Sequence, residues 1–257
     1  MNNYKLHTGQ PAHGLPISDP GPFGVGANNK PSYTTDQAGK HITRDNLRFH
    51  DRNGDQKVDL HYKVDERFNT EQKRRVRQAA QAWQDVANIN FREQAAGTDG
   101  TVTVNCNPQS ERSFAVFPNR SSAHTAATIG TRGAANSAAL GGYFSLNVVH
   151  EIGHAIGLQH PGNYNGNGDY QRNAAYAQDT QARSVMSYWS ERHQPGHDFR
   201  RMQPSAPMMD DIAAAQRLYG ANHQTRNTDT TYGFNSNTER EVLSPVSYTH
   251  LTLPTKA

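Results

Sequence analysis

The chain has 257 residues, of which 34% are hydrophobic and 19% are charged, and it carries a formal net charge of +3. This length allows one large domain with a sizeable core. The sequence holds no run of about 18 apolar residues, which excludes a membrane-spanning helix, and an excess of three positive charges is a weak basis for a nucleic-acid partner. A single cysteine excludes an intramolecular disulfide, whereas thirteen histidines raise the question of a metal site.

The first 30 residues are rich in Gly, Pro and Asn and show no hydrophobic periodicity. We interpret residues 1–30 as a flexible leader or a pro-segment. No apolar stretch follows Lys5, so the sequence lacks the pattern of an ordinary secretory signal peptide.

Two short runs of alternating hydrophobic residues follow, at residues 47–49 and 58–62, with Asn53-Gly54 between them. This arrangement predicts a β-hairpin over residues 47–62. Its tip is acidic, but Gly54 is the fourth residue counted from Asp51 and the EF-hand loop needs glycine at the sixth position. We therefore expect a plain polar turn there.

Periodic segments then alternate through the rest of the chain. Apolar residues at helical spacing predict a helix over residues 70–88, whose basic run Lys73 to Arg77 we expect to be a solvated face. The following β-type runs lie at residues 89–91, 101–106, 114–117 and 125–130. Helices are expected at residues 145–158 and 208–219, the latter ending at Gly220. This order predicts an α+β domain.

The segment from His150 to His160 reads HEIGHAIGLQH, the pattern H-E-x-x-H followed by x-x-G-x-x-H. On a helix His150 and His154 project from the same face, as two ligands of one tetrahedral zinc ion require. Gly157 can take the left-handed conformation that ends the helix, so that His160 can return as a third ligand. Three protein ligands leave one position for water, and Glu151 can reach that water as a general base without being a ligand.

This extended motif resembles that of the metzincin zinc endopeptidases, and its surroundings resemble the serralysin family. Four similar segments lie at or after the third histidine: HPGNYN at 160–165, SVMSYW at 184–189, DDIAA and QRLYGAN within 210–222, and YGFNSN at 232–237. Upstream, residues 30–46 resemble the start of the mature enzyme. Pro161 and the single cysteine differ from astacins, and Tyr188 replaces the proline usual in matrixins.

The resemblance implies a zincin fold with a twisted, mainly parallel mixed sheet, three main helices and an active-site cleft between two subdomains. It implies a catalytic domain at residues 31–222 and a secreted, monomeric endopeptidase of broad specificity that binds one zinc ion and takes protein substrates. Met186 would pack beneath the metal, and Tyr188 would be a resting-state zinc ligand that stabilises the oxyanion. The alternative for Tyr188 is core packing beside Trp189. An extended substrate would add to a sheet edge near residues 113–117.

Two features depart from the family. No G-G-x-G-x-D repeat is present, so we expect this sequence to lack the calcium β-roll and, with it, the family's C-terminal secretion signal. We interpret residues 223–240 as a linker toward that missing domain and residues 241–257 as a foreign tail. The resemblance places half of a calcium site at Arg226, Thr228 and Thr230, although a plain loop is the alternative. A non-catalytic zinc module and an unstable fragment remain as other interpretations of the whole chain.

Overall fold

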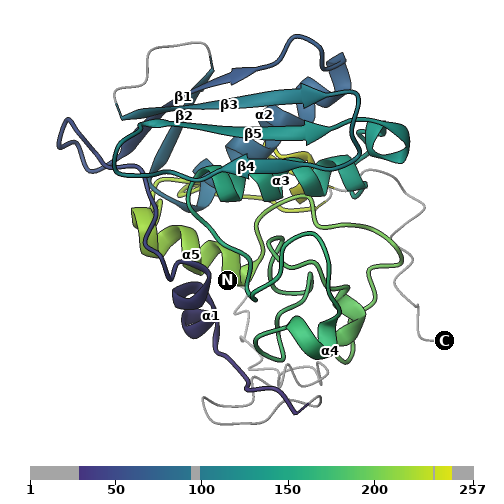
Figure 1. Cartoon of the computed structure of the whole chain (residues 1–257). Helices are drawn as coiled ribbons and strands as arrows, with labels where there is room; N and C mark the ends of the chain where they lie inside the picture. Colours follow the sequence, from purple (N-terminus) through teal and green to yellow (C-terminus); the bar gives the residue numbers. More distant parts are fainter. Residues whose placement is uncertain (1–28, 94–98, 234, 245–257) are drawn as a thin grey trace, which may run out of the picture.

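The computed structural model describes residues 29–93, 99–233 and 235–244. A five-stranded sheet forms one layer, and the helices lie against and below one of its faces (Figure 1). The sheet order is β2-β1-β3-β5-β4, with β1 (Val58–Val64), β2 (Ile89–Glu93), β3 (Gly100–Asn107), β4 (Phe114–Val116) and β5 (His124–Gly130). All neighbours are parallel except β4, which pairs antiparallel with β5 at the edge. The predicted α+β class with a mainly parallel mixed sheet is confirmed.

Two long helices, α2 (Thr70–Val86) and α3 (Tyr143–Ala155), cover the sheet, while α1 (Thr35–Ile42) packs on α5 (Met209–Tyr219) below them. The short helix α4 (Tyr170–Asn173) lies in the loop region after α3. Trp83 is fully buried between α2 and α3 and donates its indole N–H to the Val149 carbonyl at 3.1 Å. No helix among the described residues is long and apolar enough to span a bilayer.

The predicted hairpin over residues 47–62 is wrong. Residues 46–50 form no strand, and β1 pairs instead with β2 and β3. The polar turn is present, because the Asp51 carboxylate accepts hydrogen bonds from the backbone N–H groups of Asn53 and Gly54. Phe49 is buried and its N–H donates to the Tyr219 hydroxyl, so α5 takes the place of a strand partner. The alternating pattern at residues 47–49 therefore reflects one buried side chain, that of Phe49, in a loop.

The helix predictions are confirmed in position and shifted at their ends. The helix predicted at 70–88 ends at Val86, because β2 begins directly afterwards; the one predicted at 145–158 starts at Tyr143 and ends at Ala155. Gly220 caps α5 with φ 81°. Helix α1 was not expected, although the sequence contains its signal: Thr34 and Gln37 form a reciprocal capping box at its start.

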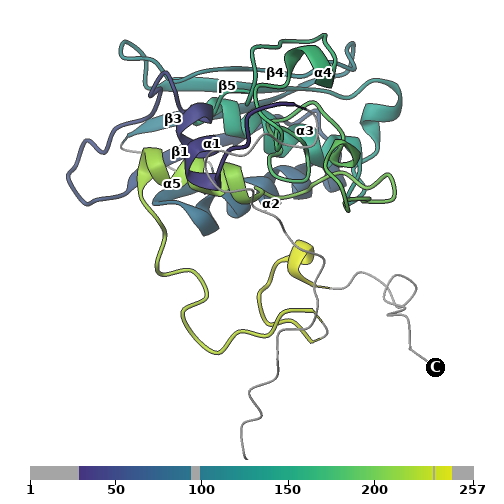
Figure 2. The same cartoon turned by 90° about the horizontal axis from the view of Figure 1, so that it is seen from below.

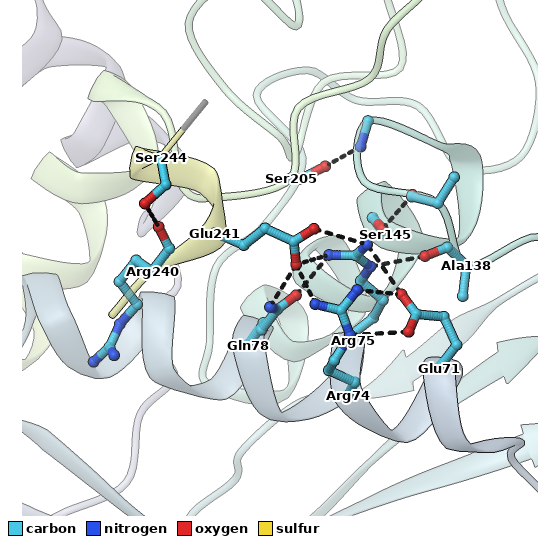
Figure 3. Close-up of polar contacts among 12 residues, drawn as sticks. Glu71, Arg74, Arg75, Gln78, Ala138, Ser145, Ser205, Arg240, Glu241 and Ser244 are labelled. Atoms are coloured by element: carbon cyan, nitrogen blue, oxygen red, sulfur yellow. Dashed lines mark hydrogen bonds and ion pairs between the residues drawn. The ribbon is translucent and has the colours of Figure 1, made fainter. Parts of the chain in front are cut away.

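The chain after α5 returns to α2, as Figure 2 shows. Asp85 binds the guanidinium groups of Arg226 and Arg240 at 2.7 and 2.9 Å. The Glu241 carboxylate contacts Arg74 and accepts hydrogen bonds from Arg75 at 2.8 Å and from Gln78 at 2.9 Å (Figure 3). Arg75 and Glu241 are 166 positions apart in the sequence. The basic run of α2 is therefore ion-paired, and Arg75 is only 5% exposed rather than solvated.

We expect Glu241→Gln to lower the free energy of unfolding at pH 7 by about 1 kcal/mol, because the pair is partly exposed. Burial would raise the pKa of Glu241, but the bonds from Gln78, Arg75 and Arg74 outweigh it and lower the pKa to about 2. A depressed carboxyl pKa stabilises the fold above the unfolded pKa of about 4.3 and loses that contribution as pH falls toward 2. Urea unfolding at pH 7 and at pH 2 measures the change.

The matched control is Glu239→Gln, since Glu239 is exposed and belongs to the same segment. Its stability should equal that of the original chain at both pH values. An equal loss for both variants, or a loss for Glu241→Gln that persists at pH 2, would contradict an ionic contact.

Candidate metal centre

The three predicted histidines converge on one point. His150 and His154 lie one turn apart on α3, and the chain reverses at Gly157, whose φ is +107°. His160 returns from the following loop, with its Nε2 atom 3.2 Å from Nε2 of His150 and 3.0 Å from Nε2 of His154. They form the one group of three or more His, Cys, Asp or Glu side chains in the described part of the chain that could hold a metal ion.

The hydrogen bonds of the three rings define their tautomers. The Nδ1 atoms of His150, His154 and His160 lie 2.8, 2.7 and 2.9 Å from the backbone carbonyls of Val185, Leu158 and Tyr164. A carbonyl only accepts, so each Nδ1 carries the proton and each Nε2 presents a bare lone pair. Three lone pairs that face one another repel unless a cation lies between them.

The spacing of these atoms fits zinc. Tetrahedral zinc with Zn–N bonds of 2.0–2.1 Å separates its nitrogen ligands by about 3.3 Å, close to the distances that the structure shows between the imidazole Nε2 atoms. Burial lowers the pKa of His150 to about 4 and that of His160 to about 3, and it lowers the pKa of His154 as well. The imidazoles are thus neutral at pH 7, the form that binds metal.

Glu151 lies beside the histidines and is buried, with a relative exposure of 5%. Its Oε2 atom has no hydrogen-bond partner among the described residues, which is unusual for a buried carboxyl oxygen. Burial raises the pKa of this carboxyl to about 8. An unpaired carboxyl oxygen next to a metal-binding cluster is free to bond a water or a substrate.

A cleft runs past these residues. It consists of two hollows of about 340 and 460 Å³, both lined by His150, Glu151 and Tyr188. The edge strand β4 borders the cleft through Phe114, whose side chain is 56% exposed. A larger hollow of about 840 Å³ lies beside α1 and includes none of the predicted site residues. The strand at the end of the sheet order therefore borders the cleft.

The segment predicted to support the metal lies below α3. Met186 is fully buried, and a Cβ added at Gly153 would come within 2.7 Å of its Sδ atom, so a side chain there would have to displace the thioether. Tyr188 is 38% exposed rather than core-packed, with its ring centroid 4.5 Å from that of His160. Burial raises the pKa of its phenol. The structure thus places Tyr188 at the cleft, and its role as a ligand stays a prediction.

Asp211 also belongs to this site. It lies in a segment that resembles the serralysins, but the sequence analysis gave it no role. From α5 its carboxylate accepts bonds from the Ser184 hydroxyl at 2.6 Å and from the Val185 N–H at 2.7 Å. The Val185 carbonyl in turn accepts the His150 Nδ1 proton. Asp211 therefore holds the carbonyl that orients one histidine. The only available signal was its position in the segment that resembles the serralysins.

The predicted calcium residues lie apart from the cleft. Arg226 binds Asp85, and the Thr230 hydroxyl donates to the Thr228 carbonyl at 2.9 Å. No group of acidic or metal-ligating side chains gathers around them among the described residues. Calcium binding at Arg226, Thr228 and Thr230 stays a prediction.

The three converging histidines on this α+β fold form a candidate metal site, at the positions where the sequence resembles the metzincin motif. The chain is 39% identical over 249 residues to Metallopeptidase AprA of Pseudomonas marginalis, covering 86% of this chain and 52% of the relative. It is 40% identical over 253 residues to Metalloprotease AprA of Pseudomonas entomophila, and 39% identical over 251 residues to Serralysin C of Dickeya chrysanthemi; each match covers 87% of this chain and 52% of the relative. Over the matched region the chain is homologous to metalloproteases of the serralysin family.

The chain spans about half the length of the curated relatives it matches. No protein-family model matches it. Among solved structures, myroilysin aligns with 18% identity and a TM-score of 0.38, covering 63% of this chain and 93% of that one. The hatching enzyme zinc-protease HCE-1 of Oryzias latipes aligns with 16% identity and a TM-score of 0.41, covering 68% of this chain and 95% of that one.

Proposed function

We propose that the chain is a zinc-dependent endopeptidase that hydrolyses peptide bonds of extended protein segments. The observation that carries this proposal is the set of three bare Nε2 lone pairs beside an unpaired buried carboxyl oxygen of Glu151. His150, His154 and His160 would hold the zinc ion. When bound, zinc supplies a Lewis acid that polarises a carbonyl and lowers the pKa of a coordinated water.

The protein's own groups would perform the proton transfers. The charge of a bound zinc ion would oppose the effect of burial and favour the ionised form of Glu151, which accepts a proton from the attacking water and later gives it to the amine that leaves. Tyr188, exposed at the cleft beside His160, donates its phenol proton in a hydrogen bond to the developing oxyanion. Burial raises the pKa of this phenol, which keeps it a donor at neutral pH.

The substrate would bind along β4. This strand pairs with β5 on one side, so its other edge can accept the backbone hydrogen bonds of an extended peptide. Recognition through main-chain bonds imposes few demands on side chains, which supports broad specificity. We also propose that the enzyme acts outside the cell as a monomer, in line with the family resemblance.

Removal and return of zinc tests this function. The purified chain should cleave a denatured protein substrate, lose that activity on treatment with a chelator, and regain it when one zinc ion per chain is restored. His154→Ala should bind zinc weakly and stay inactive, because two ligands remain. A chain that binds one zinc ion without hydrolysis would favour a non-catalytic module, and a chain that binds none would indicate that the site does not form.

A further inference from the structure

Another carboxylate near the metal centre, that of Asp179, is fully buried. Its Oδ1 atom accepts a hydrogen bond from the Tyr164 hydroxyl at 2.8 Å and another from the Ser187 hydroxyl at 2.7 Å. Its Oδ2 atom accepts from the Ala175 N–H at 3.3 Å. One side chain thus joins three segments of the loop region that follows α3.

Tyr164 links this carboxylate to the third histidine. Its backbone carbonyl accepts the proton of His160 Nδ1 at 2.9 Å, and its ring is stacked on the His160 ring with centroids 5.2 Å apart. The position of Tyr164 therefore determines where His160 Nε2 points. His160 depends on this contact more than its partners do, because it comes from a loop whereas His150 and His154 belong to α3.

Ser187 links the same carboxylate to the segment that carries Met186 and Tyr188. The Ser187 hydroxyl donates to Asp179 and accepts a bond from the Trp189 N–H at 3.2 Å. The loop of His160 and the loop of Tyr188 are therefore held together by one buried oxygen atom.

We propose that Asp179 is a positioning residue of the metal centre, which orients His160 through Tyr164 and holds the Tyr188 segment against it. The proposal rests on the proposed zinc site. The hydrogen-bond partners of the Asp179 carboxylate among the described residues are Tyr164, Ser187 and Ala175, none of which is a predicted zinc ligand, so its effect is expected on zinc affinity rather than on a chemical step.

Zinc affinity measured by competition with a chelator at pH 7 tests this role. We expect Asp179→Ala to weaken zinc binding by about 10- to 100-fold, the range typical of partners that orient metal ligands. Zinc should also pass to the chelator faster from this variant. Asp179→Asn should lose less, because its amide oxygen can still accept from both hydroxyls.

Asp99→Ala is the matched control. Asp99 is also a buried carboxylate that accepts backbone bonds, from Arg52 at 2.8 Å and Asp59 at 2.7 Å, but these partners lie before and within β1 rather than in the loops that follow α3. It should lower the melting temperature without changing zinc affinity. Equal zinc affinities for Asp179→Ala and Asp99→Ala would overturn the proposal.

Tyr164→Phe provides a second test that does not depend on the folding of Asp179→Ala. It removes the hydroxyl and keeps both the stacked ring and the carbonyl that His160 uses. We expect Tyr164→Phe to lower zinc affinity a few-fold. The double variant Tyr164→Phe, Asp179→Asn should lose no more affinity than whichever single variant loses more. Unchanged affinity in Tyr164→Phe, or effects that multiply in the double variant, would show that Asp179 does not act through Tyr164.

These measurements separate the inference from the proposed function, since none of them uses peptide hydrolysis. A chain that binds zinc but cleaves nothing would end the endopeptidase proposal and leave the role of Asp179 intact. A chain that cleaves the substrate, but whose zinc affinity does not depend on Asp179, would support the endopeptidase proposal and end the proposed role of Asp179.

Discussion

Replacing Glu151 with glutamine is expected to reduce kcat for peptide hydrolysis by about 10²- to 10⁴-fold, the range for loss of a general acid–base group. Glutamine has nearly the same shape and cannot accept a proton from water. Because Glu151 Oε2 bonds no described residue, the substitution breaks no hydrogen bond of that oxygen within the described part of the chain. Rates at saturating substrate, together with the zinc content of the purified variant, measure the effect.

Zinc content should stay at one ion per chain in Glu151→Gln, since the three histidines are untouched. Glu111→Gln serves as the control, because Glu111 is 58% exposed at its side chain and lines neither hollow. Its kcat should match that of the original chain. Full activity in zinc-loaded Glu151→Gln would assign the general base to another group.

Replacing Gly157 with alanine is expected to destabilise the fold by about 4 kcal/mol, at the upper end of single substitutions. The backbone φ of +107° disfavours any side chain, and an added Cβ would lie 1.9 Å from the Leu47 carbonyl oxygen. The reversal after α3 cannot open without moving His160 away from the other two histidines. Urea unfolding and zinc content should therefore both report the loss.

Gly54→Ala isolates the steric part of this effect. Gly54 also has a positive φ, +78°, but no atom lies within 4 Å of an added Cβ. It should cost only about 1 kcal/mol, from the backbone conformation alone, and leave zinc binding unchanged. If the two variants were equally stable, the contact with Leu47 would not constrain the turn.

Much of the site could be predicted from the sequence because its information is local. The helical period of 3.6 residues brings His150 and His154 to one face, and Gly157 marks the reversal that returns His160. Helix α2 and the strand positions likewise follow from periodicities within one segment. The misplaced hairpin shows the limit of that reasoning: Phe49 alternates like a strand residue, yet its burial comes from α5.

The remaining features depend on contacts between distant segments, and local periodicity carries no record of them. The strand order places β1 between β2 and β3, and β5 beside β3, through connections that no motif specifies. The Val185 carbonyl that orients His150 lies 35 residues away from it, and Glu241 reaches Arg75 across 166 residues. The sequence determined which side chains can bind the metal, whereas tertiary packing supplied the carbonyls, the buried carboxylates and the cleft that orient them, because these arise only when separate segments bury their surfaces together.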